Sequence, residues 1–425
     1  MSPTFRALSV RNYRLYAMGG VISNTGTWVQ RVAQDWLVLV LHHGDPAKAS
    51  VALGITTGLQ FLPILLLSPY AGLIADRMPK RRLLQLTQVG LGLWSAVLAA
   101  LALAGVAQPW MVYVVALGFG AAAAFDAPAR QSFVSEMVEP DVLTNAVGLN
   151  SASFNLARVI GPALSGFLIA ALGSGERATG AVIALNAISY IPVIIALRMM
   201  RASELTPVPR APRGRGQIRD GVSYVVHSPQ LLMVLIAGGF AGTFGMNFQM
   251  TSALMATQVF GKGPGEYGLL GTTLAFGSLS AALLGARRSS KPRPRLVILA
   301  GMAFGVVEIV AGAMPTYVLF ACLTPLLGLA LLTMLNAANT TVQLSTDPAM
   351  RGRVMALYMM IVMGGTPLGS PVMGWIGATW GARWTLYAGG GLTLLGAGLA
   401  VLVYRLASAR VVVESRACIP ATADS

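Results

Sequence analysis

Long apolar runs separated by short polar connectors set the strongest limit on how this chain folds. Apolar residues make up 55% of the sequence and charged residues only 11%, whereas about a quarter of a soluble domain is charged. A helix that crosses a bilayer needs about 20 apolar residues, so the 425 residues suit twelve such helices joined by short loops. The sequence therefore predicts an all-α membrane protein and excludes a soluble domain.

The predicted spans form two sets of six on either side of one long connector. This organisation predicts an N-terminal half (1–200), a cytoplasmic linker with an interfacial helix (201–229), a C-terminal half (230–406) and a cytoplasmic tail (407–425). Weak internal repeats, such as Glu139-Pro140 and Asp347-Pro348, relate the two halves. Parallel six-helix repeats place a substrate cavity between the halves near the membrane midplane. We place the spans at residues 14–41, 50–74, 83–105, 109–128, 142–172, 178–199, 230–258, 266–286, 295–314, 316–344, 353–379 and 383–406.

The basic residues are confined mainly to the predicted loops of one side. The net charge of +15 could indicate nucleic-acid binding, but a one-sided distribution is the positive-inside pattern of a membrane protein. It predicts that both termini are cytoplasmic and that the charges face anionic membrane lipids. The exceptions are Lys48, Arg177, Lys262 and Arg383 in outer loops, and Arg31 and Arg158 within spans.

No pattern for a cofactor, a metal or covalent catalysis is found. The two cysteines, Cys322 and Cys418, do not have metal-ligand spacing, and the sequence has no phosphate-binding Gly-x4-Gly-Lys-Ser/Thr loop and no His-Glu-x-x-His motif. We therefore expect a protein that is not an enzyme and that needs no cofactor or metal.

Polar residues of the first span share one helical face. Asn24, Trp28, Arg31 and Asp35 follow one another at intervals of three or four residues. A charge at the bilayer centre costs roughly 2.5–3.5 kcal/mol, so Arg31 and Asp35 must face protein or a water-filled cavity. One interpretation is a structural ion pair between them. The other is that Asp35 exchanges protons, with Arg31 as its coupling partner or as a contact for an anionic substrate.

Further polar residues within spans are candidates for the cavity wall. Amides in spans can bind ligands, but they also hold membrane helices together, so both interpretations stay open. Glu308 is the sole acid in the interior of the second half's predicted spans, and its role is left open. The candidate cavity residues are Asn24, Trp28, Asn155, Arg158, Thr243, Asn247, Asn336, Asn339 and Gln343.

A charged turn between spans two and three carries the clearest motif. The pattern Gly72-x-x-x-Asp76-Arg77-x-x-Lys80-Arg81 resembles the loop 2–3 signature of the major facilitator superfamily, with Pro79 where the family usually has glycine. The resemblance implies that the turn latches the cytoplasmic ends of helices. Asp76 would then cap the start of span eleven, and Arg77 would meet Asp126 near Arg130.

Span five resembles the antiporter motif of the same superfamily, which is associated with export. The match consists of Gly148, Ala157, Gly161, Pro162, Ser165 and Gly166, with Ala157 and Ser165 in place of two glycines. The arginine that drug antiporters usually carry in span four is missing, because nothing between Tyr113 and Phe125 is basic. This absence gives Arg31 and Asp35 more weight as the proton-coupling residues.

Three further stretches, 5–16, 26–38 and 125–131, are similar to the drug:proton antiporters and enterobactin exporter-like proteins of this superfamily. The resemblance implies a secondary active transporter of the bacterial inner membrane, which we expect to be a monomer. It would export amphipathic small molecules, drug-like compounds or siderophores, by alternating access against an inward flow of protons. The alternatives are a nutrient importer or facilitator of the same fold, and a lipid-flipping or interaction protein of the membrane.

Overall fold

The computed structural model describes residues 3–206, 217–287, 294–347 and 350–417. Side chains at positions 3, 69, 72, 73, 75, 76, 217, 218, 286 and 408–417 are outside the described part. The described residues form helices and contain no strand. The expected all-α membrane fold is confirmed.

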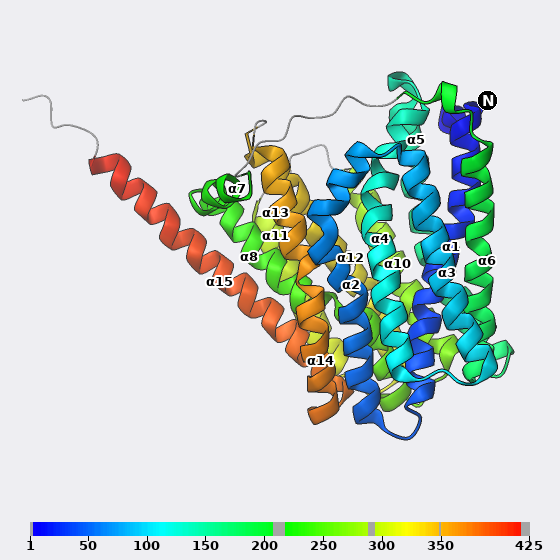
Figure 1. Ribbon diagram of the computed structural model, residues 1–425. Coiled ribbons are helices and arrows are strands. Elements are labelled where there is room, and N and C mark those ends of the chain that lie inside the picture. Colours follow the sequence, from blue (N-terminus) through cyan, green and yellow to red (C-terminus); the bar gives the residue numbers. More distant parts are fainter. Residues whose placement is uncertain (1–2, 207–216, 288–293, 348–349, 418–425) are drawn as a thin grey trace, which may run out of the picture.

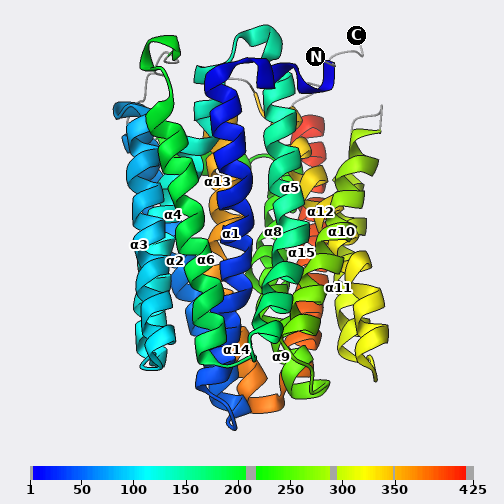
Figure 2. The same cartoon turned by 90° about the vertical axis from the view of Figure 1, so that its right-hand side faces the viewer.

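The first half of the bundle, as we call helices α1 to α6, consists of long helices that alternate in direction (Figures 1 and 2). Proline occupies the first turn of α2, α4 and α5, where its missing N–H is not needed. The bounds are η1 (Pro3–Ser9), α1 (Arg11–Leu41), α2 (Pro46–Arg77), α3 (Lys80–Ala104), α4 (Pro109–Met137), α5 (Pro140–Ala171) and α6 (Glu176–Met199).

The second half, as we call helices α8 to α15, is reached through η2 (Ala202–Glu204) and the short helix α7 (Gln217–Val226). Helix α7 packs against α13 and α8. Arg353 of α13 donates a hydrogen bond of 2.9 Å to Asp220 of α7. The bounds are α8 (Pro229–Phe244), η3 (Gly245–Asn247), α9 (Phe248–Leu254), η4 (Met255–Val259), α10 (Pro264–Ala286), α11 (Pro294–Gly312), α12 (Tyr317–Ser345), α13 (Arg351–Gly364), α14 (Thr366–Trp380) and α15 (Ala382–Ala417).

Eleven helical segments within the described residues are long and apolar enough to cross a membrane. Helix α1, with 31 residues, is as long as these segments, but its polar face lowers its hydropathy. It supplies the twelfth span that the sequence predicts. The limits of the two halves and the separate role of the 407–425 tail stay predictions, and α15 continues as a helix to Ala417.

Two spans predicted as continuous helices are interrupted. Span seven changes from α8 through a 3-10 turn to α9 and then to a π-helical turn. At Gly245 a Cβ would lie 2.5 Å from the Phe304 ring, and the Asn247 amide donates to the backbone carbonyl of Thr243 at 2.9 Å. Span eleven is divided into α13 and α14 at Gly365, two residues before Pro367, which has no N–H to continue the helix.

The apolar core shows where the two halves meet. We call the end of the bundle that carries η1 and α7 the linker end, and the opposite end the closed end (Figure 1). Toward the closed end, one hydrophobic cluster combines residues of both halves, such as Leu53 and Leu254. At the linker end the core divides into one cluster of the first half, around Phe133, and another of the second half, around Val234. The halves therefore pack together at the closed end and separate at the linker end.

Candidate functional site

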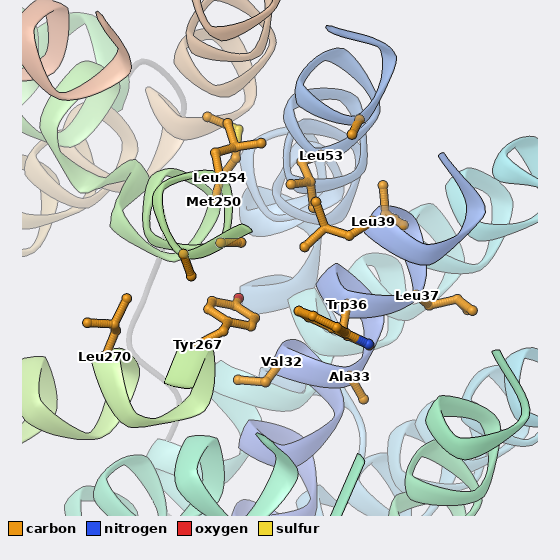
Figure 3. Packing of buried hydrophobic residues seen from close by; sticks show 14 of the residues in the cluster. Val32, Ala33, Trp36, Leu37, Leu39, Leu53, Met250, Leu254, Tyr267 and Leu270 are labelled. Atoms are coloured by element: carbon orange, nitrogen blue, oxygen red, sulfur yellow. The ribbon is translucent and has the colours of Figure 1, made fainter. Parts of the chain in front are cut away.

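The carboxylate of Asp35 connects the two halves. Its Oδ2 accepts hydrogen bonds of 2.7 Å from Gln249 Nε2 of α9 and of 2.7 Å from the Tyr267 hydroxyl of α10. Figure 3 shows the Tyr267 ring close to Val32 of α1, on the side of the helix that faces α10. Asp35 is 5% exposed. The site thus places an acidic group of α1 inside the contact between the halves, within the closed-end core.

Arg31 lies one turn before Asp35 but does not pair with it. Its guanidinium carbon is 4.7 Å from the centroid of the Trp28 ring and 5.8 Å from that of Phe61, and its Nε has no hydrogen-bond partner among the described residues. The interpretation as a structural ion pair is therefore wrong, and the Asp35 carboxylate instead accepts hydrogen bonds from Gln249 and Tyr267 of the second half.

Arg158 of α5 is a second cation that forms no ion pair with a described acid. Its Nη2 is buried and has no hydrogen-bond partner in the described part of the chain. One turn earlier on the same helix, the Phe154 ring packs edge-on against Trp28, with 6.0 Å between the centroids. Asn24 and Asn155 are half-buried on the same two helices, and the Asn155 amide donates to its own helix at Ser151.

The second-half candidates form mainly local hydrogen bonds. Thr243 is half-buried beside the α8 break, while Asn247 is 2% exposed and its Oδ1 lacks a partner among the described residues. On α12, Gln343 donates to Asn339 at 3.0 Å, and Asn336 is exposed. The structure brings none of these five side chains into hydrogen-bond contact with Arg31 or Arg158.

The residues that resemble the antiporter motif hold α5 against α1 and α10. Gly161 packs against Trp28, and Ser165 donates to the Val29 carbonyl of α1 at 2.8 Å. Gly166 lies directly against the backbone of Pro264 in α10. The buried residue Ala157 lies on the same face of α5, whereas a Cβ at Gly148 would have no neighbour within 4 Å.

A threonine hydroxyl of the second half is inserted at the proline of α5. Pro162 disturbs the helical hydrogen bonds around it, and the Thr272 hydroxyl donates to the Val159 carbonyl at 2.7 Å and accepts from the Ala163 N–H at 3.1 Å. The hydroxyl thereby bridges the donor and the acceptor of one turn of α5. Thr272 is a closed-end contact that the sequence did not reveal.

The latch residues lie at the linker end, where they bind mostly within the first half. Lys80 pairs with Glu136 at 2.6 Å, and Arg81 donates to the Leu197 carbonyl at the end of α6 at 2.6 Å. The side chains of Gly72 and Asp76 are outside the described part, so the expected cap on α13 stays a prediction.

The structure contradicts the expected contact between Arg77 and Asp126. Asp126 accepts hydrogen bonds from Thr87 and Gln88, each 2.7 Å long, and pairs with Arg130 at 3.0 Å. Arg77 is exposed. Three donors from α3 and α4 therefore satisfy the buried carboxylate that Arg77 was expected to bind.

Glu308 is buried inside the second half, and no described residue forms an ion pair with it. It is 1% exposed, and its Oε2 has no hydrogen-bond partner among the described residues. An unpaired buried charge costs several kcal/mol, so we expect the Glu308 side chain to be protonated and neutral. Glu308→Gln should then leave the thermal unfolding temperature unchanged or raise it, as measured in detergent. A drop of several degrees would show that the carboxylate is ionised and bound.

The chain is similar to known membrane transporters along most of its length. The sequence profile of the transmembrane secretion effector family matches residues 2–422. The staphyloferrin A transporter of Staphylococcus aureus is 26% identical over 82% of this chain and 85% of its own length. The multidrug efflux pump Tap of Mycolicibacterium fortuitum is 26% identical over 84% of this chain and 86% of its own length.

A solved structure supports the same fold. A bacterial homologue of the iron transporter ferroportin, in an inward-facing state, superposes with a TM-score of 0.71 at 14% identity, and the match covers 93% of this chain and 98% of that one. At this identity the likeness concerns the fold alone. Together with the family match, it indicates membrane transport without enzymatic chemistry. The chain belongs to the transmembrane secretion effector family of the major facilitator superfamily.

Proposed function

We propose that the protein exports amphipathic small molecules, drug-like compounds or siderophores, in exchange for protons. The observation that carries this proposal is the Asp35 carboxylate, which is hydrogen-bonded across the contact between the halves. The protein would act as a monomer in the bacterial inner membrane, with both termini and the linker end in the cytoplasm. The names of the relatives, a staphyloferrin A transporter and a multidrug efflux pump, support transport of such molecules.

Asp35 would couple protons to the rocking of the two halves. With the closed end shut, burial opposes the charge of the carboxylate, and the two donated hydrogen bonds offset part of that cost. Opening the closed end separates α1 from α9 and α10, so Asp35 would lose both donors, reach the water outside and take a proton from it. Closing again would return Gln249 and Tyr267 to the carboxylate and release the proton toward the cytoplasm.

The same cycle would give the direction of substrate movement. The substrate would enter between the halves from the linker end, where the two apolar clusters are separate. We assign the wall of that space to Asn24, Trp28, Asn155 and Arg158, and to the second-half candidates Thr243, Asn247, Asn336, Asn339 and Gln343. Proton binding to Asp35 would follow substrate release outside, which makes the exchange obligatory.

Everted membrane vesicles test the proposal directly. Vesicles that contain the protein should accumulate a substrate dye when their lumen is made more acidic than the medium, because their cytoplasmic face points outward and protons must leave the lumen as the dye enters. Collapse of the gradient with an uncoupler should stop the accumulation. Uptake that ignores the gradient would contradict antiport and would favour a facilitator.

The charged turn would set the rate at which the linker end closes. We expect Asp76→Ala to slow turnover more than it weakens substrate binding, because the latch acts between conformations and not on the substrate. Initial efflux rates and equilibrium binding should be compared with those of Glu139→Ala, which changes an exposed acid at the same end of the bundle. An unchanged efflux rate would reduce the turn to a signal for membrane orientation.

A further inference from the structure

Two guanidinium groups inside the bundle, those of Arg31 and Arg158, form no ion pair with any described acid. Arg31 contacts only aromatic rings through its guanidinium, and Arg158 has a buried nitrogen without a partner among the described residues. Burial of an unpaired charge costs several kcal/mol in a protein interior. Such an arrangement is favourable when a ligand supplies the opposite charge.

The two arginines lie on neighbouring helices beside one aromatic pair. Arg31 stacks on Trp28, Trp28 packs against Phe154, and Phe154 lies one helical turn from Arg158. Helices α1 and α5 run in the same direction, because Tyr13 contacts Ala146 and Val29 contacts Ser165. From the linker end toward the closed end, the order along the bundle is therefore Phe154, Arg158, Trp28 and Arg31.

The face of α5 that carries Arg158 is directed between α1 and α10. Gly161, three residues later, packs on Trp28 of α1, and Pro162, four residues later, packs on Gly268 of α10. Residues three and four positions apart share a helical face. Arg158 therefore lies on the side of α5 that faces the second half, on the linker-end side of the closed contact.

The acids of the second half do not compensate these charges. Between residues 229 and 407 its helices carry two acids, Glu266 in the first turn of α10 at the closed end and Glu308. Glu308 is buried in α11 beside Gly389 of α15. In the first half, Asp35 accepts hydrogen bonds from the neutral Gln249 and Tyr267, so its charge offsets only one of the two guanidinium charges. The region around Trp28 is thus positive on balance.

We propose that Arg31 and Arg158, together with the neighbouring rings of Trp28 and Phe154, bind amphipathic anions. A carboxylate or similar oxyanion would pair with a guanidinium, which presents several donors in a fixed plane, and the apolar body of the ligand would pack on the two rings. The site adds a substrate class, amphipathic anions, to the proposed function. That these anions are transported rests on the proposed function. A cationic compound would be repelled from the same site.

Three probes that share one apolar body separate charge from hydrophobic contact. The full chain in nanodiscs of zwitterionic lipid should bind 2-naphthoate at least about tenfold more tightly than 2-naphthalenemethanol or 2-naphthylmethylammonium, as measured by calorimetry. Arg158→Gln should remove this preference, and Arg158→Lys should retain most of it. Arg177→Gln, at an exposed arginine of the closed end, should change nothing.

The outcomes distinguish the site from the transport mechanism. Equal binding of the three probes, or a preference that survives Arg158→Gln in a folded protein, would overturn the anion site even if efflux is proton-driven. Naphthoate binding without proton-driven efflux would keep the site and remove the proposed function. Loss of naphthoate binding in nanodiscs that contain phosphatidylglycerol would assign the anion site to a lipid headgroup, and unchanged binding would assign it to a soluble anion.

Discussion

Asp35→Asn is expected to reduce proton-driven efflux to the level of vesicles without the protein. Asparagine has nearly the same size, and its carbonyl oxygen can still accept from Gln249 and Tyr267, so the contact between the halves should persist. An amide does not exchange a proton in the physiological range, so the coupling step is lost while the fold is kept. Dye accumulation in everted vesicles and the thermal unfolding temperature measure the two effects separately.

A matched acid outside the spans serves as the control for this variant. Asp45 precedes α2 at the closed end and accepts a hydrogen bond from the Lys48 N–H at 3.0 Å, a bond that asparagine can also accept. Asp45→Asn should therefore transport normally. Proton-coupled efflux that survives in Asp35→Asn would remove Asp35 from the mechanism and leave the carboxylate as a structural contact.

The donors to Asp35 show why a site between two halves escapes sequence reasoning. Hydropathy predicts where helices lie, and spacing correctly places Arg31 and Asp35 on one helical face. Gln249 and Tyr267, however, are 214 and 232 residues away from Asp35. No periodic pattern connects such distant positions, whereas helical spacing does suggest an ion pair with the near neighbour Arg31. In the structure, Asp35 instead accepts hydrogen bonds from neutral donors of the second half.

The broken helices were missed for a related reason. The apolar runs around Gly245 and Gly365 are continuous in sequence, and hydropathy does not register backbone geometry. The breaks depend on close neighbours: Phe304 against Gly245, and Thr243 of α8 against Gly365. The length and apolar character of a span can be predicted from local composition, whereas its interruptions depend on helices that meet it only in the folded bundle.

Gly268→Val is expected to abolish transport by keeping the closed end open. In the shut contact, a Cβ at Gly268 would overlap the Pro162 carbonyl oxygen of α5 and would lie 3.1 Å from the Cα of Gly166. Both neighbours are backbone atoms that side-chain movement cannot displace, so the helices must separate. Alternating access requires this contact to form in every cycle, and efflux should therefore stop although each half can still fold.

The conformational effect of Gly268→Val can be measured without transport. Ser50 lies fully buried at the closed end beside Gln258, so Ser50→Cys in a background without the native cysteines should react slowly with an impermeant maleimide added outside cells. Gly268→Val should make this reaction at least about tenfold faster. Gly148→Val provides the control, because a Cβ there has no neighbour within 4 Å. Slow labelling and normal efflux in Gly268→Val would mean that α5 and α10 separate in both states, and the closed end would not be a gate.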